Sequence, residues 1–438
     1  MHAETMRWNL VNSVAQDISS QPNPTMPPEP PNQNTCVYYA GLWVEEALKA
    51  ELFGFSISGN NLQKRFLDTL QDIEMHPHRI YSIRPARSYP AQKLLWRGLR
   101  KTDGEGHAIN YLPFVNWGPV KVLTQGFAFL FSFVVDRIKR GRKGGAPVLI
   151  SYNLSHPQGL FLWLASWITG TKWIVFLADF PGVASSQGNG LARKISFLLE
   201  RTFVRFAKSL ILLNPNLVGD YGIRLPYLNI IPAPPCEVME QLFRLPVRAG
   251  KDRTILYAGA LDETRGVGNL LKAIRILDPG MKIKFIIAGK GPLLGDVETA
   301  ARDDSRIVYA GCLSQKELFE LYQTAGALVN PHLISTLESR SVFPNKLIEY
   351  LASGTPVISS RVANIDTYFP AQAIYLESDS PESIAKGVMA FCESSEDKLR
   401  AMAESARDIL QCGELFKRQK EELRAFICNT ASRRNPAA

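Results

Sequence analysis

The chain has 438 residues, 46% of them hydrophobic, which suits two globular domains of about 200 residues each. Lys and Arg (50) outnumber Asp and Glu (41), and the net charge of +9 favours polyanionic partners such as nucleotide phosphates, acidic lipid surfaces or nucleic acid. Six scattered cysteines without a Cys-x-x-Cys pair argue against a disulfide framework or a zinc site. We find neither a secretory signal nor an apolar stretch of about 18 residues, so we expect a cytoplasmic protein.

The first hundred residues contain one predicted strand and one predicted helix. Residues 1–35 are polar and proline-rich, which predicts a disordered leader, and Cys36–Ala40 is a plausible first strand. In Phe55–Leu70, a glycine turn at Gly59 leads into an amphipathic helix. Glycine permits close approach of the backbone to a ligand, although a glycine before a helix is more often a plain turn.

Two basic segments follow. Residues 84–101 carry six Lys and Arg around the apolar run Leu94–Trp96, which suits an anionic membrane, a lipid diphosphate or a solvated loop. Residues 121–143 are an apolar run with a basic end. That run is too short to span a bilayer, and we expect a core helix.

Polar residues follow the ends of predicted parallel-type strands. His156 and Asp179 come just after two of these strands, where open α/β sheets bind ligands, although such residues often cap or pack instead. Residues 225–245 are proline-rich and are expected to connect two domains. The strands are continuous apolar runs at Pro147–Tyr152, Lys172–Ala178 and Ser209–Leu213.

The second half repeats a pattern of buried strand, glycine turn and helix. Alternating strands and helices predict right-handed βαβ units with a parallel sheet, an α/β fold. Arg265-Gly266 follows the first of these strands, and Gly289 lies in the turn after the second. The strands are expected within Thr254–Leu261, Lys284–Pro292, Arg306–Leu313 and Ala327–Pro331.

The stretch 341–360 is a short helix that feeds into a buried strand. Pro344 suits a first helical turn, and Ser341, Asn345 and Glu349 are spaced four apart, so they share one face. A helix N-terminus binds phosphate, and a carboxylate one turn along accepts hydrogen bonds from a ribose diol. A surface helix with a solvated carboxylate is the alternative.

The run Phe343–Ile358 closely resembles the donor-site helix of the family 4 retaining glycosyltransferases of GT-B fold. It is most similar to the branch with a Phe-Pro-x-Lys opening, found in bacterial surface-polysaccharide pathways. The resemblance covers most of residues 36–428 and implies two Rossmann-like parallel-sheet domains facing a cleft. The expected parts are an acceptor domain at 36–225, a linker at 226–250, a nucleotide-sugar domain at 251–411 and a helix at 412–428 that crosses back to the first domain.

The resemblance also implies roles for individual residues. Glu349 matches the glutamate that holds the ribose, and Arg265 matches one of two cations on the donor diphosphate. Ala260 and Ser341 replace the other cation and a sugar-binding glutamate, and Lys346 is a candidate for the missing charge. Donor binding is assigned to Gly59, Asn60, Arg265, Gly289, Leu313, Asn345, Lys346 and Glu349, catalysis to Arg265, Glu349 and His156, and the acceptor side to Asp179.

The predicted function is transfer of a sugar, a hexose by resemblance, from a nucleotide-sugar substrate with retention at the anomeric carbon. We find no Asp-x-Asp motif, so we expect neither a metal nor another cofactor. The expected acceptor is a glycan or a polyprenyl-diphosphate-linked glycan, and the expected location is the cytoplasm, with peripheral contact with the inner face of the plasma membrane as an option. An inactive GT-B scaffold, suggested by Ala260 and Ser341, and a GT-B sugar-nucleotide epimerase are the alternatives. No nucleic-acid module is recognisable.

Overall fold

The computed structural model describes residues 35–432 except for 46–47, 49–56, 104–105, 142–144, 154–157, 179–197, 200, 221, 233, 248–252, 337–338 and 340–342. Apart from Thr35, the expected leader therefore lies outside the described residues. The chain divides into two compact units. We call residues 23–232 together with 417–438 the N-terminal unit, and residues 233–416 the C-terminal unit.

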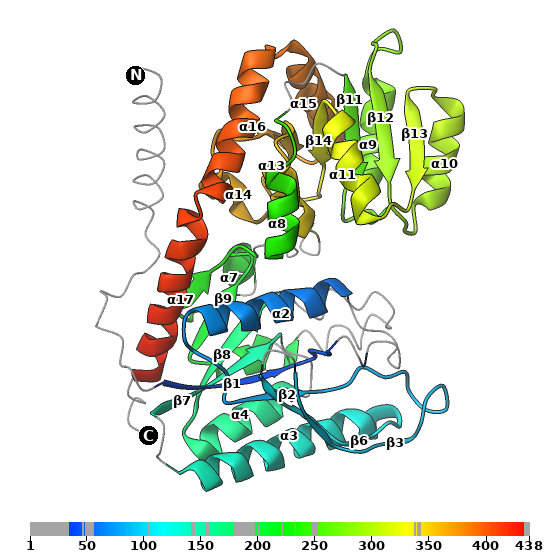
Figure 1. Ribbon diagram of the computed structural model, residues 1–438. Coiled ribbons are helices and arrows are strands. Elements are labelled where there is room, and N and C mark those ends of the chain that lie inside the picture. The colour runs from blue at the N-terminus through cyan, green and yellow to red at the C-terminus, as the bar shows by residue number, and fades with distance from the viewer. Residues whose placement is uncertain are drawn as a thin grey trace, which may run out of the picture. The chain divides into compact units, whose positions relative to one another are not determined.

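A mostly parallel sheet forms the centre of the N-terminal unit (Figure 1). Its eight strands lie in the order β10-β9-β8-β7-β1-β2-β5-β4, and β4 is antiparallel to β5. The predicted strands β1, β7, β8 and β9 are confirmed within one residue at each end. The strands are β1 (Thr35–Gly41), β2 (Arg79–Ser82), β4 (Leu99–Thr102), β5 (Ala108–Tyr111), β7 (Ala146–Tyr152), β8 (Lys172–Leu177), β9 (Ser209–Leu212) and β10 (Tyr227–Asn229).

Helices cover both faces of this sheet. Figure 1 shows α3 and α4, which pack against each other, on one side of the sheet and α2 on the other. The buried face of α3 places Phe133 against Tyr38 and Tyr81, with ring centroids 5.2 and 5.8 Å apart. The prediction of a core helix with a basic end in residues 121–143 is therefore confirmed for the side of α3 that carries Phe133. The helices are α2 (Ile57–Asp72), α3 (Gly118–Arg140), α4 (Gln158–Thr169), α7 (Asn216–Asp220) and α17 (Glu414–Ser432).

The basic segment 84–101 is more ordered than a solvated loop. It contributes β3 (Leu95–Trp96), which pairs antiparallel with β6 (Phe114–Val115) in a two-stranded ribbon. Trp96 is buried and stacks on Phe114 with ring centroids 5.5 Å apart. The interpretation as a solvated loop therefore does not hold for Trp96, which packs against the partner strand, whereas Leu94 and Leu95 stay exposed.

The last helix, α17, is attached to the N-terminal unit from Lys417 onward. The side chain of Gln419 accepts a hydrogen bond from the N–H of Ile231 at 2.8 Å and donates one to its carbonyl oxygen at 3.0 Å. Ser209 and Thr430 share a buried hydrogen bond of 2.9 Å. None of the described helices is long and apolar enough to cross a membrane.

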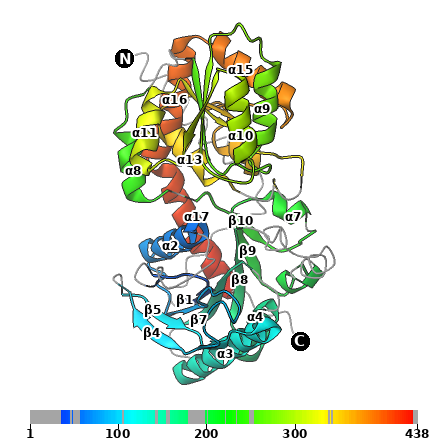
Figure 2. The same ribbon diagram turned by 90° about the vertical axis from the view of Figure 1, so that its right-hand side faces the viewer.

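The C-terminal unit is built on a parallel sheet of six strands (Figure 2). Their order is β13-β12-β11-β14-β15-β16, and every neighbouring pair is parallel, as the alternation of strands and helices predicted. The strands are β11 (Thr254–Ala258), β12 (Lys284–Ala288), β13 (Ile307–Gly311), β14 (Ala327–Asn330), β15 (Val357–Ser359) and β16 (Ile374–Tyr375).

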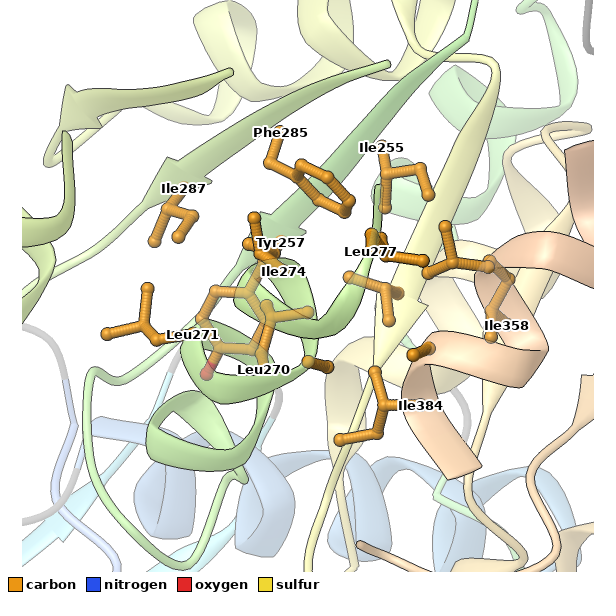
Figure 3. Packing of buried hydrophobic residues seen from close by; sticks show 14 of the residues in the cluster. Ile255, Tyr257, Leu270, Leu271, Ile274, Leu277, Phe285, Ile287, Ile358 and Ile384 are labelled. Atoms are coloured by element: carbon orange, nitrogen blue, oxygen red, sulfur yellow. The ribbon is translucent and has the colours of Figure 1, made fainter. Parts of the chain in front are cut away.

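The core of this unit lies between the sheet and helices α9 and α15 (Figure 3). Ile255 and Phe285 from the strands meet Leu270 and Ile274 of α9 and Ile384 of α15, and all five are buried. The helical elements are α8 (Cys236–Phe243), α9 (Val267–Ile276), α10 (Leu294–Asp303), α11 (Gln315–Thr324), α13 (Asn345–Ala352), η2 (Val362–Asn364), α14 (Ile365–Tyr368), α15 (Pro381–Glu393) and α16 (Glu396–Gln411).

The segment expected as a linker, 226–250, carries regular structure. Its strand β10 pairs with β9, and its helix α8 packs against α13 while burying Met239 and Leu242. The boundary between the two units falls between Pro232 and Ala233. The boundary thus lies inside the expected segment, and the apolar residues between its prolines form a short strand and a short amphipathic helix.

Candidate functional site

Two glycine turns meet at the carboxyl edge of the C-terminal sheet, after β11 and after β12. Gly289 has a φ of +139°, and a Cβ atom there would lie 1.8 Å from the carbonyl oxygen of Gly259. Leu261 donates its N–H to the carbonyl oxygen of Lys290 at 3.0 Å. The two turns are therefore fixed to each other at the edge where open α/β sheets bind their ligands.

Arg265 lies in the loop that leads from β11 into α9. Asp262 holds this loop, because its Oδ1 accepts hydrogen bonds from the N–H of Arg265 at 2.9 Å and from the hydroxyl of Thr264 at 2.6 Å. Gly266 then caps α9 with a φ of +75°, and a Cβ atom there would lie 1.9 Å from the carbonyl oxygen of Pro331. Arg265 thus sits directly before a helix N-terminus, where backbone N–H groups and the helix dipole favour an anion.

The helix α13 carries the predicted ribose-binding carboxylate. It begins at Asn345, so Pro344, which was predicted to lie in the first helical turn, is instead the residue just before that turn. The hydroxyl of Tyr350 ties α13 to the sheet, since it accepts from the N–H of Ala258 and donates to its carbonyl oxygen, both at 2.9 Å. Because α13 joins the parallel strands β14 and β15, its N-terminus also lies at the carboxyl edge.

Glu349 and Lys346 form an ion pair on the exposed side of α13. Nζ of Lys346 lies 2.8 Å from Oε2 of Glu349, three residues along the helix. The Glu349 side chain is 19% exposed and that of Lys346 is 43% exposed. Lys346, expected as a free cation for the diphosphate, is therefore paired with the carboxylate expected to bind the ribose.

His332 is a buried histidine in the loop after β14. Its Nε2 lies 2.8 Å from the carbonyl oxygen of Ser339, so Nε2 carries the proton and donates, while Nδ1 has no partner among the described residues. Burial and, to a smaller extent, the nearby charge of Arg265 together lower the pKa of His332 to about 4. His332 is thus neutral at neutral pH and fixes the loop that precedes α13.

Asp379 holds the other end of the same loop. Burial alone would raise the pKa of its carboxyl, but hydrogen bonds from Ser335 and from the backbone N–H of Ile334 bring the pKa below its ordinary value. Oδ2 of Asp379 accepts the N–H groups of Ile334 at 2.7 Å and Ser335 at 2.8 Å. Its own carbonyl oxygen accepts from Asn269 of α9 at 2.7 Å, which links this loop to the helix beside Arg265.

The predicted site residues of the C-terminal unit gather at this edge of the sheet. Arg265 and Gly289 lie in the turns after β11 and β12, and Leu313 lies two residues beyond β13. Their contact with a donor stays a prediction. The unit contains Arg265, Gly289, Leu313, Asn345, Lys346 and Glu349.

The predicted glycine turn at Gly59 is wrong. Helix α2 begins at Ile57, so Gly59 and Asn60 lie inside its first turn. Asn60 is buried, and its side-chain amide accepts from the N–H of Val44 at 2.8 Å and donates to its carbonyl oxygen at 3.0 Å. Asn60 therefore anchors the chain after β1, and a donor-binding role for either residue stays a prediction.

Three other residues of the sequence argument lie outside the described residues: His156, Asp179 and Ser341. Two residues of the site were missed. His332 follows a strand end just as His156 does, and the same rule would have found it. Lys290 stands between two glycines in a turn at the carboxyl edge, which is also a usable signal.

Solved structures with a similar arrangement cover nearly the whole chain. Sucrose-phosphate synthase from Thermosynechococcus elongatus matches with a TM-score of 0.57 and 15% identity, covering 89% of this chain and 97% of its own. Anabaena HepE, solved in complex with UDP, matches with a TM-score of 0.59 and 10% identity, covering 90% of this chain and 100% of its own. The fold is GT-B. That fold-level prediction is confirmed.

Sequence matches are confined to parts of the chain. Residues 252–394, in the C-terminal unit, match the family model of the glycosyl transferases group 1. An uncharacterized glycosyltransferase of Methanocaldococcus jannaschii, MJ1607, is 26% identical over 142 residues, which is 31% of this chain and 35% of the relative. The putative glycosyltransferase EpsF of Bacillus subtilis is 32% identical over 114 residues, 25% of this chain and 28% of the relative. The matches thus span about a third of each curated relative.

Proposed function

We propose that this protein is a retaining glycosyltransferase that takes a hexose from a nucleotide-sugar donor bound at the carboxyl edge of the C-terminal sheet. The observation that carries the proposal is the placement of Arg265 before the N-terminus of α9, at the same edge as the N-terminus of α13, the helix that carries Glu349. A cation and free N–H groups suit a diphosphate, and a carboxylate suits the two hydroxyls of a ribose. The match of residues 252–394 to glycosyl transferases group 1 supports this assignment.

In the proposed reaction, the bond between the anomeric carbon and the donor diphosphate breaks as the acceptor hydroxyl attacks from the same face. The leaving diphosphate takes the bonding electrons, and its phosphate oxygen accepts the acceptor's proton. Arg265 and the N–H groups at the start of α9 stabilise the charge that grows on the leaving phosphate. Glu349 holds the ribose and so fixes the position of the diphosphate. The scheme uses no metal and no side-chain nucleophile.

The acceptor side of the proposal is a glycan or a polyprenyl-diphosphate-linked glycan of a surface polysaccharide, at the cytoplasmic face of a membrane. It is supported by the resemblance of Phe343–Ile358 to the surface-polysaccharide branch of the family and by the basic segment 84–101, in which Leu94 and Leu95 are exposed.

An inactive GT-B scaffold that binds a nucleotide is a second candidate. Ala260 and Ser341 favour it, because they remove a phosphate cation and a sugar-binding carboxylate from the pattern that the family resemblance implies. An epimerase acting on a nucleotide sugar is a third candidate.

Thermal stabilisation by a panel of UDP-, GDP- and ADP-sugars tests the donor site. A donor at about 100 times its Kd stabilises the folded protein by about 2.7 kcal/mol, which a melting experiment resolves. We expect a shift with one nucleotide class, which Glu349→Ala removes and Arg265→Ala weakens. Glu320→Ala is the matched control, since it removes an exposed helical carboxylate of the same unit.

Product analysis then separates the candidates. Release of nucleoside diphosphate with sugar on an acceptor extract indicates transfer, and an epimerised nucleotide sugar indicates the third candidate. Stabilisation by a donor without turnover indicates the scaffold. If no nucleotide sugar stabilises the protein, the donor site itself is wrongly assigned.

A further inference from the structure

Exposed apolar side chains are concentrated on one part of the N-terminal unit. Ten of the sixteen large apolar residues exposed in the described chain lie between residues 89 and 168, whereas three lie in the whole C-terminal unit. Seven of the ten belong to the β3–β6 ribbon, to α3 and to the end of α4, and the other three, Tyr89, Leu94 and Trp117, lie in the segments that lead into β3 and α3. Scattered exposed apolar residues need no explanation, but a contiguous group on neighbouring elements indicates an interaction surface.

Four of these residues form a stripe along α3, which we call the apolar stripe: Leu123, Phe127, Phe131 and Ile138. Their spacings of four, four and seven place them on one side of the helix. Phe131 and Ile138 are each 73% exposed. The opposite side of α3 is already used by the core, because it buries Phe129 and Phe133.

The stripe continues onto α4. Phe127 contacts Phe161 of α4 with ring centroids 5.0 Å apart, and α3 and α4 lie side by side in both views (Figures 1 and 2). Ile168 follows Phe161 by seven residues, so it stands on the same side of α4, and Trp167 beside it is 71% exposed. The exposed surface therefore spans two helices.

The structure also joins the two basic segments of the sequence. The amide of Asn116, which is fully buried, donates to the carbonyl oxygens of Arg87 at 2.7 Å and Lys93 at 3.2 Å. The ammonium of Lys121 in α3 donates to the carbonyl oxygen of Ala86 at 2.6 Å. The ribbon, with its exposed Leu95, is thus fixed to the first turns of α3.

Charge identifies the partner that this surface fits. Residues 84–143 contain twelve Lys and Arg but three Asp and Glu, a net charge of +9 that equals the net charge of the whole chain. The rest of the sequence is therefore balanced, and the positive excess coincides with the exposed apolar residues. Aromatic and aliphatic side chains next to cations suit the boundary between lipid headgroups and acyl chains of an anionic bilayer.

We propose that α3, the end of α4 and the β3–β6 ribbon form a peripheral docking surface for an anionic lipid bilayer. The apolar stripe enters the interface, and cations such as Arg97 and Lys139, both exposed, contact lipid phosphates. The inference rests on the proposed function in one respect, the lipid-linked acceptor. Vesicle binding measured without donor or acceptor tests it separately.

The experiment is flotation of the full chain with vesicles of phosphatidylcholine and phosphatidylglycerol, compared with phosphatidylcholine alone. We expect binding to the anionic vesicles. High salt should weaken this binding, because the Debye screening length falls to about 3 Å at 1 M ionic strength. Phe131→Ser with Ile138→Ser should lower the partition coefficient at least about tenfold. Arg97→Ser with Lys139→Ser should lower it about fivefold per charge.

Controls and contrary outcomes follow from the same surface. Ile276→Ser and Lys316→Ser remove an exposed apolar residue and an exposed cation of the C-terminal unit, and they should leave vesicle binding unchanged. An unchanged melting temperature in the α3 variants shows that they fold. The proposal is overturned if the wild type ignores anionic vesicles or if the α3 variants bind as well as the wild type. It is also overturned if those variants only convert a dimer to a monomer, since the stripe would then be a protein interface.

Discussion

Protonation of His332 should destabilise the protein in mildly acidic solution. Burial lowers its pKa to about 4 in the folded protein, whereas an unfolded chain has a histidine pKa of about 6.5. The unfolded state therefore binds a proton first as the pH falls. The stability that depends on a neutral His332 is fully present above about pH 6.5 and is lost as the pH drops toward 4.

The size of this effect follows from the two pKa values. The shift from 6.5 to about 4 corresponds to about 3.4 kcal/mol at about 1.36 kcal/mol per unit. About 2 kcal/mol of this is already lost at about pH 5, since the unfolded histidine is then almost fully protonated and the folded one is not. That is a large fraction of the stability of an ordinary domain.

The assay is chemical denaturation of wild type and His332→Asn between about pH 8 and pH 5. Asparagine keeps a donor for the carbonyl oxygen of Ser339 but does not titrate, so subtracting the two curves removes the contribution of the carboxylates. The wild type should lose about 2 kcal/mol more than the variant over this range. A difference between the two proteins that stays constant from pH 8 to pH 5 would refute the reasoning.

Three further predictions concern the same unit. Gly266→Ala should lower the free energy of unfolding, measured by chemical denaturation, by at least about 1–3 kcal/mol, because φ is +75° and the new Cβ would meet the carbonyl oxygen of Pro331 in the loop after β14. The control Gly295→Ala, which has open space around the new Cβ, should be neutral or stabilising. Tyr350→Phe should cost about 1–3 kcal/mol in the same measurement, because it removes the buried hydroxyl that bridges the backbone of β11. Lys290→Ala should weaken donor binding in the melting assay, whereas Lys316→Ala should not. The reason is that Lys290 lies in the turn after β12, which is hydrogen-bonded to the turn after β11, where Ala260 replaces the expected cation. Equal donor affinities for these two lysine variants would contradict that assignment.

The elements predicted well are those whose sequences are continuous apolar runs. Val148–Ile150 and Trp173–Leu177 are fully buried in β7 and β8, and a run of that kind fits few environments other than a parallel sheet. The buried face of α13 was equally predictable, since Leu347 and Leu351 are one turn apart and both are buried. The strands missed, such as β2 and β4, are short and mix polar with apolar residues, so their pairing is decided by neighbours rather than by their own pattern.

The structures at Gly59 and in the segment 84–101 depend on tertiary contacts. A glycine followed by two asparagines is typical of a turn, but Asn60 uses its amide to hold the backbone of Val44 and so stays within a helix. Likewise, the basic residues around Trp96 gave no sign that Phe114, eighteen positions later, would supply a partner strand. Both outcomes depend on contacts between segments that a local pattern does not contain.

The ion pair between Lys346 and Glu349 determines how the proposed site can accommodate a donor. A partly exposed pair of this kind is worth about 0–1 kcal/mol, so a ribose diol that hydrogen-bonds to Glu349 can displace Lys346 at little cost. Lys346 would then be free to turn toward the phosphates. Lys290 has no ion-pair partner among the described residues, and its turn is fixed against the one that contains Ala260. Lys346 of α13 and Lys290 of the turn after β12 are therefore two candidates to replace the cation missing at Ala260, and Ala260 alone is no sign of an inactive protein.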